Sequence, residues 1–548
     1  MGEQSRTSRA ETRFRTAGGA VRGSRSPDGV TAVLGIPYAA APFGAHRFRA
    51  PRPAAGWSGS RDCTAFGPVA PQSAELPGAP VWRPGDEEVL TVNVWVPPSD
   101  DGPLPVLFWI HGGAYTFGSS AQPDFDGAAL ARAGLVMVSC NYRVGFEGFG
   151  HVPGFPDNRG LLDQVAALRW VRENIPAFGG DPGNVTVAGH SAGAGSAVCL
   201  MAMEEARGLF RRAVAHSVPL GFFGVEAAAA ITSRIAAEAG VAATGPGLLS
   251  APPQALVAAA DEVARRCEED PVTAVQAFDP VVFQPVIDGE VLPVDPLRAL
   301  ASGTAREVDL LVCHTLEEYW FLHEVGAVRE ITSEQELAAF ADALALPARL
   351  LAGYRALMPG APVLDRYLAI FGDAVFGEYG NRLAEHHARA GGRAFLSRFA
   401  RRRPRPGGTA RPWHTADIPF AFGNLDATGA DFLIGGAPDA QDRALSRRML
   451  RAWADFAACG DPGWPPVTAD GTTVQVWAVP DDHLSDDGAS AVRALWRDVP
   501  LEAAPPPAPP PAPGPASAPA PAPAPAPAPE VTVTASPTDT LPARRTAK

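Results

Sequence analysis

Short apolar runs alternate with helical stretches along most of the chain. The runs 106–110, 135–139 and 310–313 are mostly apolar, as is typical of strands that are buried on both faces. Apolar residues recur at helical spacing from Leu161 to Ile175, and this pattern predicts a helix that ends before the break at 178–182. Strands interleaved with helices predict an α/β fold with a mostly parallel central sheet and helices on both faces.

The apolar run 185–188 leads into the pentapeptide Gly189-His190-Ser191-Ala192-Gly193, which opens into a stretch of small residues. A strand, a sharp turn and a helix form the setting that exposes a serine hydroxyl as a nucleophile. Glycines on both sides of Ser191 permit a bend in which Cβ atoms would collide. Ser191 is therefore the candidate nucleophile, although the bare G-x-S-x-G pattern is weak evidence in a chain with 56 glycines.

The order of helix, strand and elbow predicts the topology of an α/β-hydrolase sheet, with Ser191 at its carboxyl edge. The length of the chain, 548 residues, predicts large insertions after the core strands. A boundary is evident near Ala503, where a Pro/Ala-rich tract begins that cannot bury apolar surface. We expect a flexible segment over 1–12, the α/β-hydrolase domain over 13–502 and a disordered tail over 503–548. A spacer for a terminal binding segment is the alternative for the tail.

Composition and charge narrow the functional classes. No apolar run is long enough to span a bilayer, and the first residues lack the apolar segment of a secretory signal, so we expect a cytoplasmic protein. The net charge of −13 argues against nucleic acid as a partner, and we interpret the short basic run 401–405 as a solvated loop. The six cysteines are scattered, which disfavours zinc and a dense disulfide framework. We predict no metal or cofactor.

A glycine-rich loop, His111-Gly112-Gly113-Ala114, follows the predicted strand 106–110. Glycines there leave backbone N–H groups exposed, and preset donors stabilise the oxyanion of a tetrahedral intermediate. A His-Gly-Gly loop upstream of an elbow serine is more specific than an isolated Gly-Gly turn. We predict oxyanion donors at Gly113, Ala114 and Ala192, and a loop-shaping role for His111.

The chain resembles the type B carboxylesterase/lipase family, the cholinesterase-like branch of the α/β-hydrolases, through nearly all of its globular part. The matching segments, in the order of the family, are GIPYA at 35–39, RF at 47–48, NVW at 93–95, NYR at 141–143, GLLDQ at 160–164, FGGDP at 178–182, FQPVIDG at 283–289 and residues 453–462. The resemblance implies structural ion pairs between Arg47 and Glu87 and between Arg143 and Asp163.

The resemblance also points to a base and an orienting acid. The segment 414–423, HTADIPFAFG, is similar to the family's H-x-x-E/D-x-P-F-x-F-G, which implies that His414 is the general base. Alignment on the short acidic loop that follows a family strand places the orienting carboxylate at Glu318, and Glu317 would then point elsewhere. The order Ser191, Glu318, His414 agrees with the order of the triad in this fold.

Two departures from the family pattern limit what carries over. His190 stands where the family usually has glutamate, so a cationic alcohol would lose one attraction; the alternative is that His190 only packs at the elbow. The early disulfide of the family corresponds here to Ala70 and Val89, and its loss fits a reducing compartment.

These features predict a serine carboxylesterase that hydrolyses small to medium aliphatic or aryl esters through an acyl-enzyme. An acyltransferase or specialised tailoring esterase with the same triad is the alternative, and a non-catalytic binding protein of the same fold is a further one. Side chains that could bind substrate are His190, Phe222, Phe283 and Phe321, although aromatics at such places are as often core. We expect a small-molecule ester as the only partner and a monomer or weak homo-oligomer.

Overall fold

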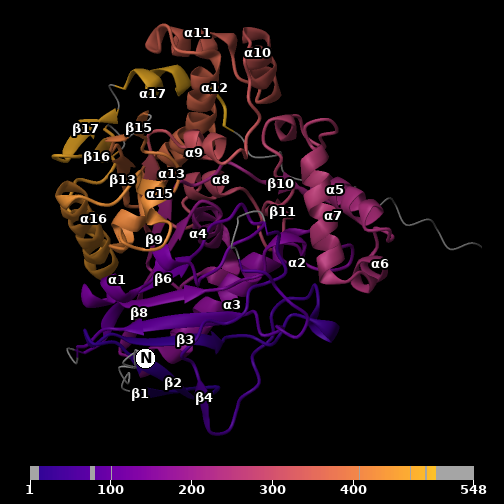
Figure 1. Ribbon diagram of the computed structural model, residues 1–548, viewed down its shortest axis with the longest axis vertical. Helices are drawn as coiled ribbons and strands as arrows, with labels where there is room; N and C mark the ends of the chain where they lie inside the picture. The colour runs from indigo at the N-terminus through magenta and orange to yellow at the C-terminus, as the bar shows by residue number, and fades with distance from the viewer. Residues whose placement is uncertain are drawn as a thin grey trace, which may run out of the picture. The chain divides into compact units, whose positions relative to one another are not determined.

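The computed structural model describes residues 11–74, 80–99, 102–405, 408–468, 471–487 and 490–501 (Figure 1). The predicted tail over 503–548 and nearly all of the predicted segment 1–12 lie outside these residues. The first strand, β1, begins at Glu11.

A large central sheet organises the described chain. Its strands lie in the order β1-β2-β3-β5-β7-β6-β8-β9-β12-β13-β16-β17, and β4 pairs with β2. Their bounds are β1 Glu11–Thr16, β2 Gly19–Arg25, β3 Thr31–Pro37, β4 Ser60–Asp62, β5 Thr91–Val96, β6 Leu104–Ile110, β7 Val136–Cys140, β8 Gly180–His190, β9 Arg212–His216, β12 Asp309–Thr315, β13 Ala394–Phe399, β16 Thr473–Trp477 and β17 His483–Asp486. From β7 to β16 neighbouring strands are parallel, and antiparallel pairs flank this region at both ends.

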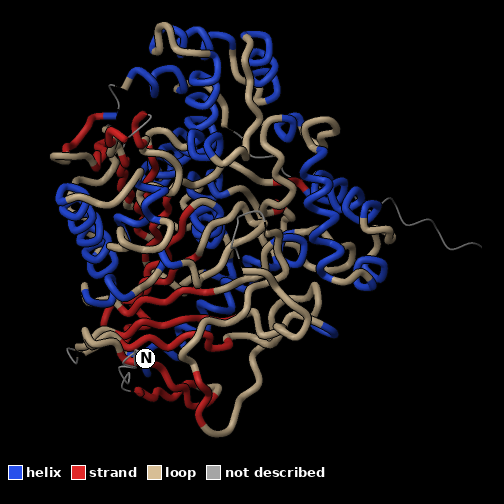
Figure 2. The backbone as a smooth tube through the Cα atoms, viewed as in Figure 1, coloured by secondary structure: helices blue, strands red, loops and turns tan. Residues whose placement is uncertain are grey.

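Both faces of the parallel region are covered by helices, which Figure 2 shows in blue on the two sides of the red sheet. The helices are α1 Ala128–Arg132, α2 Gly145–Phe149, α3 Arg159–Asn174, α4 Ala192–Ala202, α5 Val225–Glu238, α6 Gly245–Ser250, α7 Pro253–Arg266, α8 Pro296–Ala301, α9 Tyr319–Glu324, α10 Glu334–Ala343, α11 Ala348–Leu357, α12 Val363–Gly372, α13 Glu378–Arg389, α14 Ile418–Phe422, α15 Ala430–Ile434, α16 Ala440–Cys459 and α17 Ala491–Trp496. The predicted helix from Leu161 to Ile175 is α3, and the predicted sheet is confirmed.

Strand β6 shows why its sequence is apolar without interruption. Successive side chains of a strand point to opposite faces. Phe108 and Ile110 belong to the core that contains α3 and α4, whereas Leu107 and Trp109 belong to the second core, under α14 and α16. Because both faces meet a core, the strand is buried from Val106 to Ile110, as expected for a parallel sheet between two helical layers.

Long helical insertions follow the core strands, as predicted. Helices α5 to α8 and the two-stranded pair β10 (Phe223–Gly224) and β11 (Val286–Ile287) lie between β9 and β12, and α9 to α13 lie between β12 and β13. In Figure 1 the insertion helices α5, α6 and α7 gather on one side and α10, α11 and α12 at the top. A small hairpin, β14 (Arg403–Arg405) with β15 (Gly408–Ala410), follows β13.

The topology brings three predicted site residues to one edge of the sheet. Ser191 follows β8 and Glu318 follows β12, while His414 lies on the connection that leaves β13 through the β14–β15 hairpin. Carboxyl ends of parallel strands meet at one edge, where ligands bind in open α/β sheets. Among the described residues, no helix combines the length and apolarity that crossing a bilayer requires.

Candidate active site

Ser191 sits at a strained turn between β8 and α4. Its backbone has φ 55° and ψ −124°, a left-handed φ that non-glycine residues rarely adopt. The Ser191 N–H donates to the His216 carbonyl oxygen at 2.9 Å, which fixes the turn to β9. A Cβ on Gly189 would lie 2.3 Å from the Gly193 oxygen, and one on Gly193 would lie 2.1 Å from the Ile110 oxygen. The two glycines of the pentapeptide are therefore steric requirements of this turn.

His414 and Glu318 form a buried pair. The Nδ1 atom of His414 lies 2.6 Å from Oε2 of Glu318, and the two residues are 5% and 3% exposed. The other carboxylate oxygen accepts from the Ser217 hydroxyl and from the Thr315 N–H, both at 2.7 Å. Because the carboxylate is fixed by neutral donors, it can hold the proton on Nδ1 and leave Nε2 as the basic nitrogen.

The elbow and His414 are brought together through His190. The rings of His190 and His414 have centroids 4.5 Å apart, so the residue before the nucleophile contacts the candidate base. The Ser191 side chain makes no capping hydrogen bond to the first turn of α4, and no hydrogen bond between Ser191 and His414 is found within the described residues. Such contacts are often long in unliganded enzymes and shorten when substrate binds.

The loop after β6 lies against the elbow. A Cβ on Gly112 would be 2.8 Å from the His190 oxygen and 3.1 Å from the Ser191 Cβ. Gly113 has φ 114° and Ala114 has φ 50°, so the backbone here is neither helical nor extended, and its N–H groups do not follow the hydrogen-bonding pattern of a helix or a strand. Within the described residues, no backbone acceptor is paired with the N–H of Gly113, Ala114 or Ala192. These three groups are free to donate to a ligand, in keeping with the predicted oxyanion hole.

His111 contacts this loop through its ring and its backbone oxygen. Its Nδ1 lies 2.8 Å from the Gly112 oxygen, its ring stacks on Tyr142 with centroids 4.5 Å apart, and the Tyr142 hydroxyl donates to the His111 oxygen. Burial lowers the pKa of His111 to about 4, so the ring is neutral near pH 7. These contacts fit a loop-shaping role.

His190 is a buried neutral ring. Burial, followed by the neighbouring His414 and His216, holds the pKa of His190 well below its ordinary value, and its Nε2 has no partner within the described residues. His216, opposite His190 in the β8–β9 pair, has its Nδ1 2.5 Å from Oδ2 of Asp417. Burial lowers the pKa of His216, but Cys313 and Asp417 outweigh this effect and raise it to about 10. His216 and Asp417 therefore form an ion pair in which the positive and negative charges offset each other.

Of the three phenylalanines predicted to bind substrate, the structure brings Phe321 to the site. Its ring centroid is 6.3 Å from that of His414. Phe283 is buried against Phe146, and within the described residues no ring contact joins Phe283 or Phe222 to the triad. Phe376, which the sequence did not single out, lies 4.7 Å from the His414 ring. It stands in a π-helical turn, Asp373–Gly377, that no local pattern marks as part of a site.

One of the two implied ion pairs is confirmed and the other is wrong. Arg143 and Asp163 form a pair at 2.7 Å in which both side chains are buried. Arg47 pairs with Glu147 of α2 at 2.6 Å, whereas Glu87 is exposed. The physical reason is burial, because a guanidinium removed from water requires a carboxylate that is buried beside it.

The interpretation of the run 401–405 as a solvated loop is wrong for Arg401, whereas Arg402 is exposed. Arg401 is 2% exposed and donates to both carboxylate oxygens of Asp442 at 2.9 Å. Arg402 pairs with Glu317 at 2.8 Å, and Arg405 pairs with Glu324 at 3.4 Å. Three arginines of the run therefore pair with acidic side chains from α16, from α9 and from the residue pair that precedes α9.

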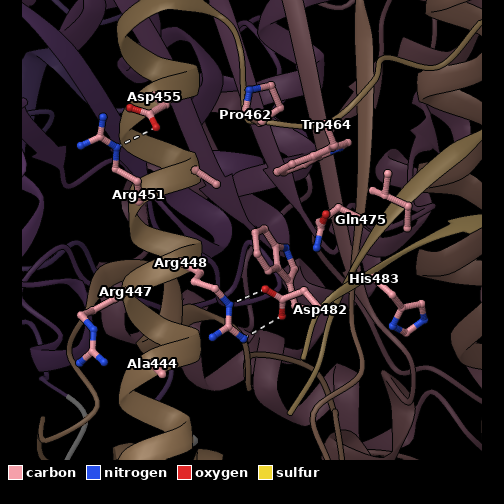
Figure 3. Close-up of a pocket in the computed structure, with 14 residues that line it drawn as sticks. Ala444, Arg447, Arg448, Arg451, Asp455, Pro462, Trp464, Gln475, Asp482 and His483 are labelled. Carbon is pink, nitrogen blue, oxygen red and sulfur yellow. Dashed lines mark hydrogen bonds and ion pairs between the residues drawn. The ribbon is translucent and has the colours of Figure 1, made fainter. Parts of the chain in front are cut away.

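A groove of about 820 Å³ lies elsewhere, between α16 and the strands β16 and β17 (Figure 3). In Figure 3, Arg448 faces Asp482 and Arg451 faces Asp455, and both pairs are ion pairs. No triad residue lines this groove. Across the described part of the chain, no three His, Cys, Asp or Glu side chains are grouped so that they could hold a metal ion.

Comparison with known proteins agrees with the architecture. The model of the carboxylesterase family matches residues 10–479. The para-nitrobenzyl esterase of Bacillus subtilis (strain 168) is 35% identical over 462 residues, which cover 82% of this chain and 91% of that protein. The phenmedipham hydrolase of Pseudarthrobacter oxydans is 34% identical over 497 residues, 86% of this chain and 94% of that protein. The crystal structure of the carboxylesterase EST55 of Geobacillus stearothermophilus at pH 6.2 superimposes with a TM-score of 0.77 at 35% identity, covering 88% of this chain and all of that one.

Proposed function

The chain belongs to the carboxylesterase family and is a carboxylic ester hydrolase, and from this premise we propose that it acts through a serine nucleophile and an acyl-enzyme. Ser191 attacks the ester carbonyl while Nε2 of His414 takes its proton. The proton then passes to the leaving alcohol, and water attacks the acyl-enzyme in the second half-reaction with His414 again as base. The constellation runs from Gly113 to His414, so we assign the activity to the predicted domain 13–502.

The bond of 2.6 Å between Nδ1 of His414 and Oε2 of Glu318 carries this proposal. A buried carboxylate in that position fixes the tautomer of the imidazole and stabilises the imidazolium as it forms. The N–H groups of Gly113, Ala114 and Ala192 would stabilise the oxyanion, because no backbone acceptor in the described part of the chain is paired with them.

The surroundings of His414 favour small to medium aliphatic or aryl esters. Phe321 and Phe376 flank the His414 ring and present apolar surface to a substrate group. The name of the Bacillus subtilis relative, para-nitrobenzyl esterase, is that of an enzyme for an aromatic ester. His190 is neutral beside the nucleophile, so this position gives no attraction to a cationic alcohol.

Labelling with a fluorophosphonate tests the nucleophile directly. We expect stoichiometric modification of Ser191, located by peptide mass spectrometry, and none in Ser191→Ala. Labelling at another residue, or turnover of an aryl acetate by the variant at the wild-type rate, would refute the assignment. Turnover in the presence of an added primary alcohol then measures how the acyl group divides between water and alcohol, which separates a hydrolase from an acyltransferase.

A further inference from the structure

The acid and the base of the proposed triad stand on two loops that leave neighbouring strands. Glu318 follows β12, whereas His414 follows the β14–β15 hairpin, which leaves β13. Two hydrogen bonds join these loops at His414 and Glu318. One links Nδ1 of His414 to Oε2 of Glu318, and the other runs from the backbone N–H of His414 to the backbone carbonyl oxygen of Glu318 at 3.3 Å. Both contacts depend on the position of His414, which is set by the path of the chain after the β14–β15 hairpin.

Glu317, the neighbour of the acid, joins the same two loops at three points. Its N–H donates to the Pro412 oxygen at 2.9 Å. Its carboxylate accepts from Nη1 of Arg411 at 2.5 Å and lies 2.8 Å from Nη2 of Arg402. Glu317 is buried, and a buried carboxylate needs nearby positive charge. Two arginines on the connection that leads to His414 supply this charge.

Arg411, one of the two arginines, is itself oriented by a second contact. The Arg411 guanidinium lies over the ring of Trp320, 4.8 Å from its centroid, and Trp320 belongs to α9, which begins directly after Glu318. A planar guanidinium held by a ring on one side and a carboxylate at its edge has little freedom to move.

We propose that Glu317, Arg402 and Arg411 form a brace that holds the His414 loop in register with Glu318. The inference rests on the proposed roles of Glu318 and His414. Glu317 is a positioning residue in this account: it touches no reacting atom and acts through the place that it gives to the imidazole. The precision that acid–base catalysis needs makes such a brace consequential, because a displacement of about 1 Å can lower a rate about 100-fold.

The decisive variant is Glu317→Gln, which keeps the size of the side chain and removes its charge. We expect kcat per fluorophosphonate-titrated site to fall about tenfold while KM for a short aryl ester stays within about twofold. A loss of folded protein alone would reduce the titrated fraction and leave kcat per site unchanged. Arg411→Gln should reproduce part of the effect, because Arg402 still pairs with Glu317 in that variant. The double variant should be no slower than Glu317→Gln alone, because that change already removes the charge that both arginines contact.

Asp442→Asn is the matched control. Asp442 also accepts two arginines of the 401–405 run, Arg401 and Arg403, but it ties them to α16 and not to the acid's loop. We expect a lower melting temperature and a kcat per site within about twofold of wild type. An unchanged kcat per site in Glu317→Gln, or an equal loss in Asp442→Asn, would overturn the brace. If Ser191→Ala and Glu318→Gln also retain activity, the proposed function fails; if they are inactive while Glu317→Gln is normal, only the brace fails.

Discussion

Position 190 lies beside the candidate base, His414, and is occupied by a neutral histidine. The substitution His190→Glu would place a side chain there that carries one negative charge when it is ionised. In the wild type this ring is buried and its pKa is depressed by burial, His414 and His216, so it is neutral over the range in which an esterase with a histidine base works. A glutamate there would place a carboxylate next to His414. The imidazolium of His216, opposite position 190 and paired with Asp417, favours ionisation of that glutamate, while Glu318 and Asp417 oppose it.

The size of the effect follows from the ring separation of 4.5 Å. At that distance two unit charges interact by about 3.7 kcal/mol at an effective dielectric constant of 20 and by about 0.9 kcal/mol in bulk water. Because about 1.4 kcal/mol corresponds to one pH unit, an interaction of this size moves a limb of a pH profile by about 0.7 to 2.7 units. A base must be deprotonated to act, so the acidic limb of the kcat/KM profile moves upward.

The assay is kcat/KM for a neutral aryl ester between pH 4.5 and 9, with titrated sites. His190→Gln is the matched control, since it is polar and uncharged, and its acidic limb should coincide with that of the wild type. A choline ester compared with its uncharged isostere gives a second readout: His190→Glu should favour the cationic ester about tenfold, which corresponds to about 1.4 kcal/mol. If the acidic limb of a folded, fluorophosphonate-reactive His190→Glu variant stays in place and the choline preference is unchanged, position 190 does not control the charge at the site.

Four further changes test other parts of the structure. Ser191→Ala should lower kcat for an aryl acetate by about 10⁴ or more, and substantial turnover by the purified variant would place the nucleophile elsewhere. Glu318→Gln should lower kcat about 10³- to 10⁴-fold, far more than Glu317→Gln, and the reverse ranking would move the acid by one residue. Gly193→Ala puts a Cβ 2.1 Å from the Ile110 oxygen and should abolish activity or folding, so a normal kcat and melting temperature would contradict the elbow geometry. Asp163→Asn leaves the buried Arg143 guanidinium without its counter-charge and should lower the free energy of unfolding in urea by about 3–5 kcal/mol; a loss below about 1 kcal/mol, typical of surface pairs, would show that the pair is not buried in solution.

The sequence could predict those parts of the site that local geometry dictates. The elbow is recognisable because its two glycines avoid steric clashes with nearby backbone. A Cβ on Gly189 would clash with Gly193, four positions away, and a Cβ on Gly193 would clash with Ile110 on the adjoining strand. The strands β6, β7 and β12 are recognisable because burial on two faces forces continuous apolar runs. Glu318 and His414 required the family resemblance, since an isolated glutamate or histidine has no local pattern that distinguishes it.

Other features depend on pairs far apart in the chain and left no local signal. Glu147 is separated from Arg47 by 100 positions, and nothing near Arg47 indicates which carboxylate is buried with it. Phe376 reaches His414 from a π-helical turn in an insertion, where no local sequence pattern marks a site residue. The burial of Arg401 in the basic run 401–405 has no local signal for the same reason: charge predicts exposure on average, and only the folded chain places Asp442 against Arg401.

The two adjacent glutamates show how tertiary partners divide one residue type into two roles. Glu318 receives a hydroxyl, a backbone N–H and the imidazole, so none of its partners apart from His414 can carry a positive charge. Glu317 receives two guanidinium groups. An arginine on Glu318 would compete with the imidazolium for the carboxylate and would stabilise the charge of Glu318 before the reaction begins, which lowers the gain when His414 becomes protonated. In the proposed mechanism, keeping the permanent cations on Glu317 and the neutral donors on Glu318 therefore leaves the charge of Glu318 available for the imidazolium of His414, the one cation that would form during catalysis.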